Sequence, residues 1–143
     1  MLPPDEASLL DAVAEPVLAS DASGRIAHAN PAASQMFGWP PGALIGLPLT
    51  VLMPERMRDR HRAGIGRYLQ THESRLFGQP VRVPALRHDG REFEIELRLR
   101  LFRRPDGSDL IIAAARNVAE AQRPSPGVIE LETRLQRRAY QLV

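Results

Sequence analysis

Residues 93–101 read Phe-Glu-Ile-Glu-Leu-Arg-Leu-Arg-Leu, so that apolar and charged residues alternate without exception. A period of two is typical of an antiparallel strand that has one face on a core and the other in solvent. Turn sequences lie on both sides of this segment: His88-Asp89-Gly90 before it and Pro105-Asp106-Gly107 after it. We therefore expect neighbouring strands over 79–87 and 110–118, which makes this part of the chain a three-stranded antiparallel meander.

A second group of strand signals lies near the N-terminus. Short apolar runs at 17–20 and 25–29 flank Asp21-Ala22-Ser23-Gly24, a sequence that favours a tight turn. These features predict a β-hairpin. Asn30-Pro31 follows it, and the run 32–37 is expected to form a short helix that ends at Gly38.

Two further helices are expected. Leu9, Leu10 and Val13 lie at helical spacing in 5–14, behind an acidic first turn, which indicates a short amphipathic helix. Proline and glutamate at 54 and 55 suit the start of the longest helix, which we expect to run to about Thr71. The order is then two strands, short helices, a long helix and three strands. It predicts an α+β fold in which helices cover one face of a five-stranded antiparallel sheet.

The chain divides into four expected regions: an N-terminal amphipathic helix (1–14), a domain body (15–122), an Arg-Pro-Ser-Pro-Gly linker (123–127) and the start of a coiled-coil signalling helix (128–143). In the last region Val128, Leu131, Leu135 and Leu142 occupy a, d, a and a positions of a heptad. Because this pattern continues to the last residues, we interpret the chain as truncated from a longer protein.

Composition excludes several classes of function. The 143 residues suit one domain, and the absence of cysteine excludes disulfides, thiolate metal sites, cysteine nucleophiles and flavin–cysteinyl photochemistry. A formal net charge of +2 and 5% aromatic residues argue against nucleic-acid binding. The longest apolar stretch, 43–53, is interrupted by Gly46 and Pro48, and the N-terminus lacks a basic signal-peptide region, so we expect a cytoplasmic protein that does not enter the membrane. No catalytic constellation is visible, and we do not expect an enzyme.

Several short motifs occur in a characteristic order: Asp21-x-x-Gly24-Arg25-Ile26, Asn30-x-Ala32-Ala33, Phe37-Gly38-Trp39, Gly46, Leu52-Met53-Pro54, His88-Asp89-Gly90-x-x-Phe93 and Ala115-Arg116-Asn117-Val118-Ala119-Glu120. Together with the order of elements they resemble the PAS family over residues 8–122. The resemblance implies a bacterial sensory module that binds a small ligand or nothing and pairs with itself. Such a module relays a ligand or redox state to a C-terminal effector in the same polypeptide, most often a histidine kinase.

His61 is the candidate ligand-binding residue. At 100° per residue, the apolar positions of the long helix lie within roughly 80° of it. They are Met57, Gly64, Ile65, Tyr68 and Leu69. His61 is thus predicted in the middle of the stripe that faces the core, and it is the one histidine expected there.

The segment from Met53 to Tyr68 also resembles the FixL-type haem oxygen sensors, a PAS subgroup in which a histidine of this helix is the proximal iron ligand. The resemblance implies iron coordination by His61, propionate pairing by two arginines and an apolar distal side. The corresponding positions are Arg67 and Arg75 for the propionates, and Leu76, Leu97 and Leu99 for the distal side. Val81 stands where those sensors carry the arginine that hydrogen-bonds bound oxygen, so the resemblance implies weak oxygen binding.

Other interpretations remain open. The ligand is otherwise unknown, His61 can be a buried core residue, and the domain can be a ligand-free dimerisation or docking module. His28, His72 and His88 show no spacing that suggests a metal site, and Trp39 is expected in the core or at its rim. A homodimer is expected through the terminal helices, because Glu94, Glu96, Arg98 and Arg100 give the sheet a charged outer face.

Overall fold

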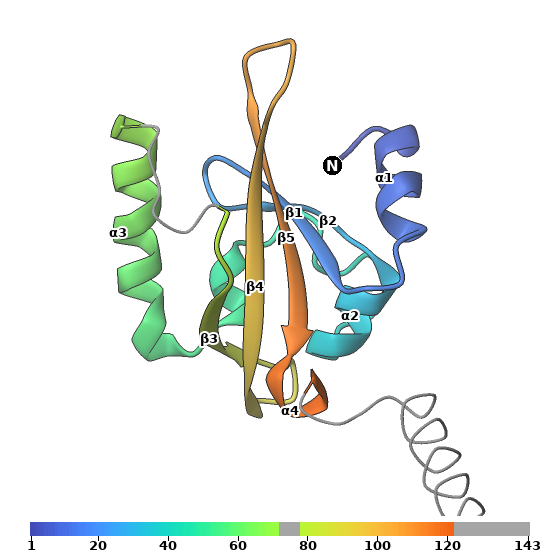
Figure 1. Ribbon diagram of the computed structural model, residues 1–143, viewed down its shortest axis with the longest axis vertical. Coiled ribbons are helices and arrows are strands. Elements are labelled where there is room, and N and C mark those ends of the chain that lie inside the picture. Colours follow the sequence, from blue (N-terminus) through green and yellow to red (C-terminus); the bar gives the residue numbers. More distant parts are fainter. Residues whose placement is uncertain (72–77, 122–143) are drawn as a thin grey trace, which may run out of the picture.

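The structure is a computed structural model that describes residues 1–71 and 78–121, without the side chains of 67–71, 120 and 121. Figure 1 shows its central sheet with helices on both sides. The elements in chain order are α1 (Pro4–Asp11), β1 (Val17–Asp21), β2 (Ile26–Ala29), α2 (Pro31–Phe37), the 3₁₀ helix η1 (Leu49–Leu52), α3 (Glu55–Thr71), β3 (Val81–Leu86), β4 (Glu92–Arg103), β5 (Asp109–Asn117) and α4 (Val118–Ala121).

The sheet has five strands in the order β2-β1-β5-β4-β3, and every neighbouring pair is antiparallel. This arrangement confirms the predicted α+β fold. The last strand in the sequence, β5, lies in the middle, where it pairs with β1 on one side and β4 on the other. The edge strand β3 contains Pro84, which an edge position tolerates because proline has no amide hydrogen to donate.

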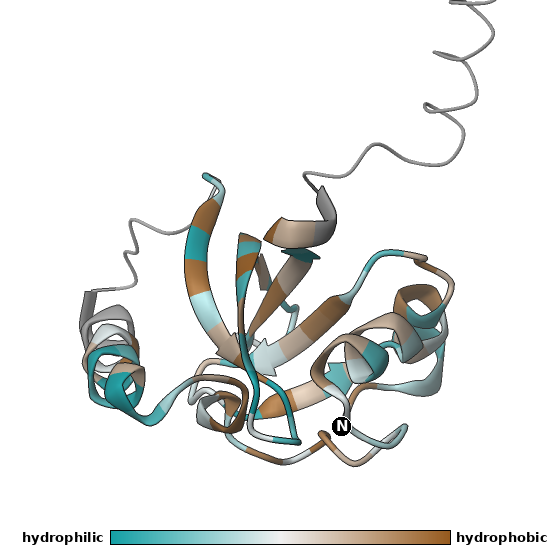
Figure 2. Ribbon diagram, turned by 90° about the horizontal axis from the view of Figure 1, so that it is seen from below, coloured by the Kyte–Doolittle hydropathy of each residue, from teal (hydrophilic) through white to brown (hydrophobic). Residues whose placement is uncertain are grey.

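The register of β4 and β5 decides which side chains face the core. Leu97 is paired with Ala115 and Leu99 with Ala113, whereas the intervening Arg98 is paired with Ala114. Since paired residues in an antiparallel sheet share a face, both leucines lie on the core face, as expected. Each is half-buried, and Leu97 packs against the core cluster. The bands of opposite hydropathy that alternate along the strands in Figure 2 reflect the same period of two.

The core lies between the inner face of the sheet and the segment from α2 to η1. Phe37, at the end of α2, is 1% exposed and makes a tilted ring contact with Phe93 of β4, with centroids 5.7 Å apart. The buried members of the cluster are Leu18, Ile26, Ala29, Ala33, Phe37, Leu44, Leu52, Ala85, Ile95 and Ala115. This core fixes α2 and η1 against the sheet.

Asn30 joins the N-terminal segment to the domain body. Its side-chain oxygen accepts hydrogen bonds from the amides of Val17 (3.0 Å) and Ala33 (2.9 Å), the second of which caps α2. Its amide nitrogen donates to the carbonyls of residues 10, 13 and 15 at 3.1, 3.1 and 2.8 Å. Asn30 has no solvent exposure, so these bonds satisfy a fully buried amide.

The N-terminal helix is shorter than predicted. It begins at Pro4 and ends at Asp11, three residues before the expected end, because the carbonyls of residues 10 and 13 turn toward Asn30. The predicted apolar face is only partly covered: Leu9 is 71% exposed and Val13 41%. The other boundaries differ from the predictions by up to two residues. The linker 123–127 and the heptad residues Val128, Leu131, Leu135 and Leu142 lie outside the described residues.

The two faces of the sheet carry different helices. His28 of β2 is paired with Ala19 of β1, while the neighbouring pair Leu18 and Ala29 belongs to the core cluster. The His28 imidazole reaches Asp11 of α1 at 2.7 Å, so α1 lies on the outer face of β1 and β2. Figure 1 shows α3 at the opposite end of the sheet, beyond β3.

Candidate functional site

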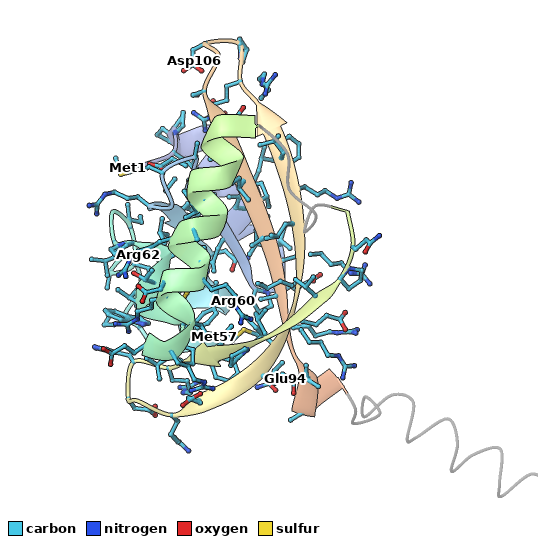
Figure 3. The ribbon with its side chains drawn as sticks, turned by 90° about the vertical axis from the view of Figure 1, so that its left-hand side faces the viewer. Met1, Met57, Arg60, Arg62, Glu94 and Asp106 are labelled. Atoms are coloured by element: carbon cyan, nitrogen blue, oxygen red, sulfur yellow. The ribbon has the colours of Figure 1, made fainter. Side chains whose placement is uncertain are left out.

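The helix α3 carries the candidate site. It begins directly after the buried Pro54, whose carbonyl accepts a hydrogen bond from the amide of Met57 at 2.9 Å. Arg56 makes a two-pronged ion pair with Glu92 at the start of β4, with distances of 3.0 and 2.7 Å. Figure 3 looks onto α3 with the strands behind it. These contacts fix the first turn of the helix next to β4.

His61 lies in the second turn of α3 and is half-buried. Its Nε2 atom is fully covered and has no hydrogen-bond partner among the described residues. Burial lowers the pKa of His61 below its ordinary value of 6.5, and the positive charge of the adjacent Arg62 lowers the pKa further. At neutral pH the imidazole is therefore uncharged, and its covered nitrogen can bind a metal ion or exchange a hydrogen bond with a ligand.

The structure places only some of the other predicted site residues. Met57 and Ile65 are half-buried on α3, one turn to either side of His61. Leu97 and Leu99 lie on the inner face of β4, and Val81 of β3 is paired with Leu97. The backbone of Arg67 and Tyr68 belongs to α3, but their side chains are not described. Arg75 and Leu76 lie outside the described residues.

Two open hollows on the surface do not involve His61. One, of about 600 Å³, is lined by Pro54, Glu55, Arg56, Arg58, Leu86 and Glu92, and the other, of about 270 Å³, is lined by Arg82, Val83, Pro84, Glu92, Phe93 and Glu94. In the described part of the chain, no three histidine or acidic side chains gather to hold a metal ion. No helix of 1–71 or 78–121 is long and apolar enough to cross a membrane.

The other described histidines have different surroundings. His28 is buried beside Asp11 on the outer face of the sheet. His88, in the β3–β4 turn, stacks on Trp39, which follows α2. The sequence predicts Trp39 in the core or at its rim but shows no signal for this pair, because the two residues meet only when α2 and the β3–β4 turn come together. His28 and His88 thus have structural partners, whereas His61 has none in the described part of the chain.

The resemblance implies haem as the cofactor. The properties of His61, the part of the site that the structure describes in detail, fit this cofactor. A histidine ligand must be neutral and must have a free ring nitrogen; the lowered pKa of His61 favours the neutral form, and its Nε2 atom has no partner among the described residues. The leucines of the inner face would supply apolar surroundings. The half-buried Val81 has no group that could donate a hydrogen bond to a bound gas molecule.

Comparison with known proteins identifies the family to which this fold belongs. A family model described as the PAS fold matches residues 6–116. An uncharacterized protein of Azorhizobium caulinodans is 35% identical over 114 residues, which cover 79% of this chain and 15% of that protein. The sensor protein FixL of Bradyrhizobium diazoefficiens is 29% identical over 128 residues, covering 90% of this chain and 25% of FixL. The chain thus spans a quarter or less of the length of these relatives.

Solved structures show the same fold at lower sequence identity. The PAS domain of a Desulfitobacterium hafniense protein is 12% identical with a TM-score of 0.62, covering 78% of this chain and 99% of that one. A PAS domain from a two-component sensor histidine kinase is also 12% identical, with a TM-score of 0.61 and coverages of 79% and 93%. Since the family model covers most of the chain and the fold agrees, the chain belongs to the PAS family of sensor domains.

Proposed function

We propose that this PAS domain is a cytoplasmic sensory module that receives a small ligand at His61 and relays the bound state to a C-terminal effector, a histidine kinase. The observation that carries the proposal is the covered Nε2 atom of His61, which has no partner among the described residues. A buried polar atom without a partner costs free energy, and a ligand that engages it would recover that cost. FixL, a sensor protein, is among the relatives of this domain.

The route from the site to an effector runs through β5. Ala115 of β5 is 1% exposed and faces Leu97 of β4 on the inner side of the sheet. Two residues later β5 ends at Asn117, whose side chain accepts a hydrogen bond from the amide of Ala119 in α4 at 3.0 Å. A shift of β4 against β5 would therefore be transmitted to α4, from which the chain continues toward its C-terminus.

Haem is the ligand that we propose to test first. His61 would hold the iron, and the partly buried Met57 and Ile65 would contribute to the apolar surroundings. When bound, haem supplies an iron centre that binds diatomic gases or changes oxidation state. The chain's own contribution is to hold a neutral imidazole on the inner side of α3. Val81 offers no hydrogen bond at the gas-binding side, which favours weak or unstable oxygen binding.

The haem proposal is tested by adding hemin to the purified chain and recording the visible spectrum. We expect a Soret band that His61→Ala abolishes while the circular dichroism spectrum is retained. His88→Ala is the matched control and should keep the band, because His88 lies in the β3–β4 turn. A parent protein without a Soret band would show that haem is the wrong ligand. His61→Ala would then change only the folding stability, by about 1–3 kcal/mol, because the packing of the half-buried ring is lost.

The domain is also proposed to pair with itself through its terminal helices. On α1 and just beyond it, Leu9 and Val13 are 71% and 41% exposed, although both are large apolar residues. Exposed large apolar side chains in the N-terminal segment can contribute to a protein–protein contact. Dimerisation without a ligand is the alternative function, and it predicts that the dimer forms equally well in His61→Ala.

A further inference from the structure

The helix α3 is attached to the domain near its first turn. The two-pronged ion pair between Arg56 and Glu92 lies there, and the Arg58 side chain donates to the carbonyl of Met53 at 3.3 Å. Met53 is extended, with φ −131° and ψ 150°, between η1 and the start of α3. A short extended link between two helices is the kind of segment in which a change of φ and ψ redirects the helix that follows.

A second attachment is made one turn beyond His61, where Ile65 meets the β1–β2 turn. A Cβ atom placed on Gly24 would lie 2.6 Å from Cδ1 of Ile65, which means that the isoleucine side chain occupies the space a larger residue would need. Gly24 is buried and has a φ of +88°. Both the positive φ and the close approach require glycine at this position.

The surface that Ile65 contacts is rigidly held. The amide of Gly24 donates to the carbonyl of Asp21 at 3.1 Å, and the carbonyl of Gly24 accepts from the amide of Leu49 at 2.9 Å. The Asp21 carboxylate accepts three further hydrogen bonds within the turn, two from Ser23 and one from the Arg25 amide. The β1–β2 turn therefore offers Ile65 a fixed platform rather than a yielding loop.

His61 lies between these two attachments. It precedes Ile65 by four residues, so both side chains are on the same side of α3. Movement of α3 away from the sheet would make the covered Nε2 atom of His61 accessible while the sheet remains folded. Among the contacts of the described residues, that of Ile65 with Gly24 must break for this movement, because the attachment at the first turn lies next to the link about which the helix would turn.

We propose that α3 is a hinged lid that holds its own residue His61 against the domain body, that Ile65 seated on Gly24 is its latch, and that the lid turns about Met53 and Pro54. This inference rests on the proposed ligand-binding role of His61 and adds how a ligand would reach it. Release of the latch would expose the imidazole while β4, β5 and the core remain folded. Ile65 and Gly24 would then set the rate at which ligands enter and leave, and His61 would set how tightly they bind.

The test uses the absence of cysteine from the sequence. His61→Cys in the full chain introduces a single thiol at the covered position, and its reaction with a disulfide reagent such as DTNB measures how often that position opens, without any ligand. In this background Ile65→Ala shortens the side chain that contacts Gly24 and so removes the latch contact. Gly24→Ala displaces Ile65 from the other side of this contact. We expect each change to accelerate labelling of the introduced thiol by about tenfold or more, with little dependence on urea at low concentrations.

Gly46→Ala is the matched control. Gly46 also has a positive φ, +87°, but a Cβ atom there would meet nothing within 4 Å. Gly46→Ala therefore introduces the same backbone strain as Gly24→Ala without contacting Ile65, so the labelling rate should stay within about twofold of the parent rate. The double variant Gly24→Ala/Ile65→Ala should label more slowly than the product of the two single effects predicts, because the new methyl group occupies space that the shortened residue 65 leaves.

Three results would overturn the lid. Labelling could be as fast in the parent as for a free thiol, it could stay unchanged in Ile65→Ala and Gly24→Ala, or its urea dependence could equal that of global unfolding. Hemin binding by the parent tests the proposed function separately. A Soret band together with unchanged labelling would reject the lid alone, and accelerated labelling without a Soret band would reject haem alone.

Discussion

The indole of Trp39 lies almost flat on the imidazole of His88, with ring centroids 3.9 Å apart and ring planes 16° from parallel. The contact connects the end of α2 to the β3–β4 turn. Two hydrogen bonds strengthen the same connection: the amide of His88 donates to the carbonyl of Phe37 at 2.8 Å, and Arg87 donates to the carbonyl of Met36 at 2.6 Å. The β3–β4 turn is thus fastened to α2, across the end of the core.

Replacement of His88 should be visible in the fluorescence of Trp39, the one tryptophan of the chain. His88→Ala removes the stacked ring, so the emission of Trp39 should change and the free energy of unfolding should fall by about 1 kcal/mol. His88→Phe is the matched control, because it keeps an aromatic ring at this position and should retain most of the stability. Equal losses in the two variants would mean that the stack contributes nothing measurable.

Asn30→Ala should be among the most destabilising substitutions in the domain. It leaves the amides of Val17 and Ala33 without their acceptor and removes the donor to three carbonyls, all at a position with no exposure. We expect a loss of about 3 kcal/mol or more in the free energy of unfolding, measured with urea.

Ser34→Ala provides the comparison for Asn30→Ala. Ser34 is also buried, at 2% exposure, but its hydroxyl has no partner among the described residues. Its removal should change the stability by less than about 1 kcal/mol, because no hydrogen bond is lost. If the two alanine variants were equally unstable, burial alone rather than the hydrogen bonds of Asn30 would explain the effect.

Asp21 should make stability depend on acidic pH. Burial by itself raises the pKa of Asp21, but hydrogen bonds from Ser23 and from the Arg25 amide outweigh it and lower the pKa below its ordinary value of 3.8. A lowered pKa in the folded state contributes stability at higher pH that is lost as the pH falls through the folded value. Asp21→Asn should therefore flatten the fall in stability below about pH 4, as measured by urea unfolding at a series of pH values.

Asp106→Asn is the matched control for Asp21→Asn. Asp106 accepts hydrogen bonds from the hydroxyl and amide of Ser108 at 2.6 and 2.9 Å, nearly the distances found between Ser23 and Asp21. The hydrogen bond from the Ser108 hydroxyl is the main reason that the pKa of Asp106 is also lowered. Both variants should flatten the dependence of folding stability on acidic pH. In the His61→Cys background, however, only Asp21→Asn should accelerate thiol labelling, because Asp21 stabilises the turn that Ile65 contacts. Equal labelling rates in the Asp21→Asn and Asp106→Asn variants would show that the Asp21 turn does not influence the opening of α3.

The proposed dimer should weaken when charge is placed on a terminal helix. Leu9→Glu should raise the dissociation constant by about tenfold or more in sedimentation equilibrium, because a buried unpaired carboxylate opposes association. Leu135→Glu tests the predicted C-terminal heptad in the same way. Phe102→Glu is the control: Phe102 is 52% exposed on β4, outside the terminal helices. A dimer broken by Phe102→Glu alone would show that the sheet forms the interface.

The sequence alone determined the secondary structure and its grouping into one α+β domain. The alternation at 93–101 predicted β4, and turn residues such as Asp21 and Gly90 marked where strands reverse. The helical period of α3 also predicted that His61 faces inward. These features are local, since the pleat of a strand, the turn of a helix and the φ of a turn residue each depend on neighbours within a few positions.

The tertiary structure decided which of these local elements meet. It placed β5 between β1 and β4, stacked Trp39 on His88, turned the carbonyls before β1 toward Asn30 and seated Ile65 on Gly24. Each of these contacts joins residues that are distant in the sequence, so its geometry follows from how all the elements pack together. A periodic pattern specifies which face of an element is apolar, but it does not specify which particular atoms that face will touch.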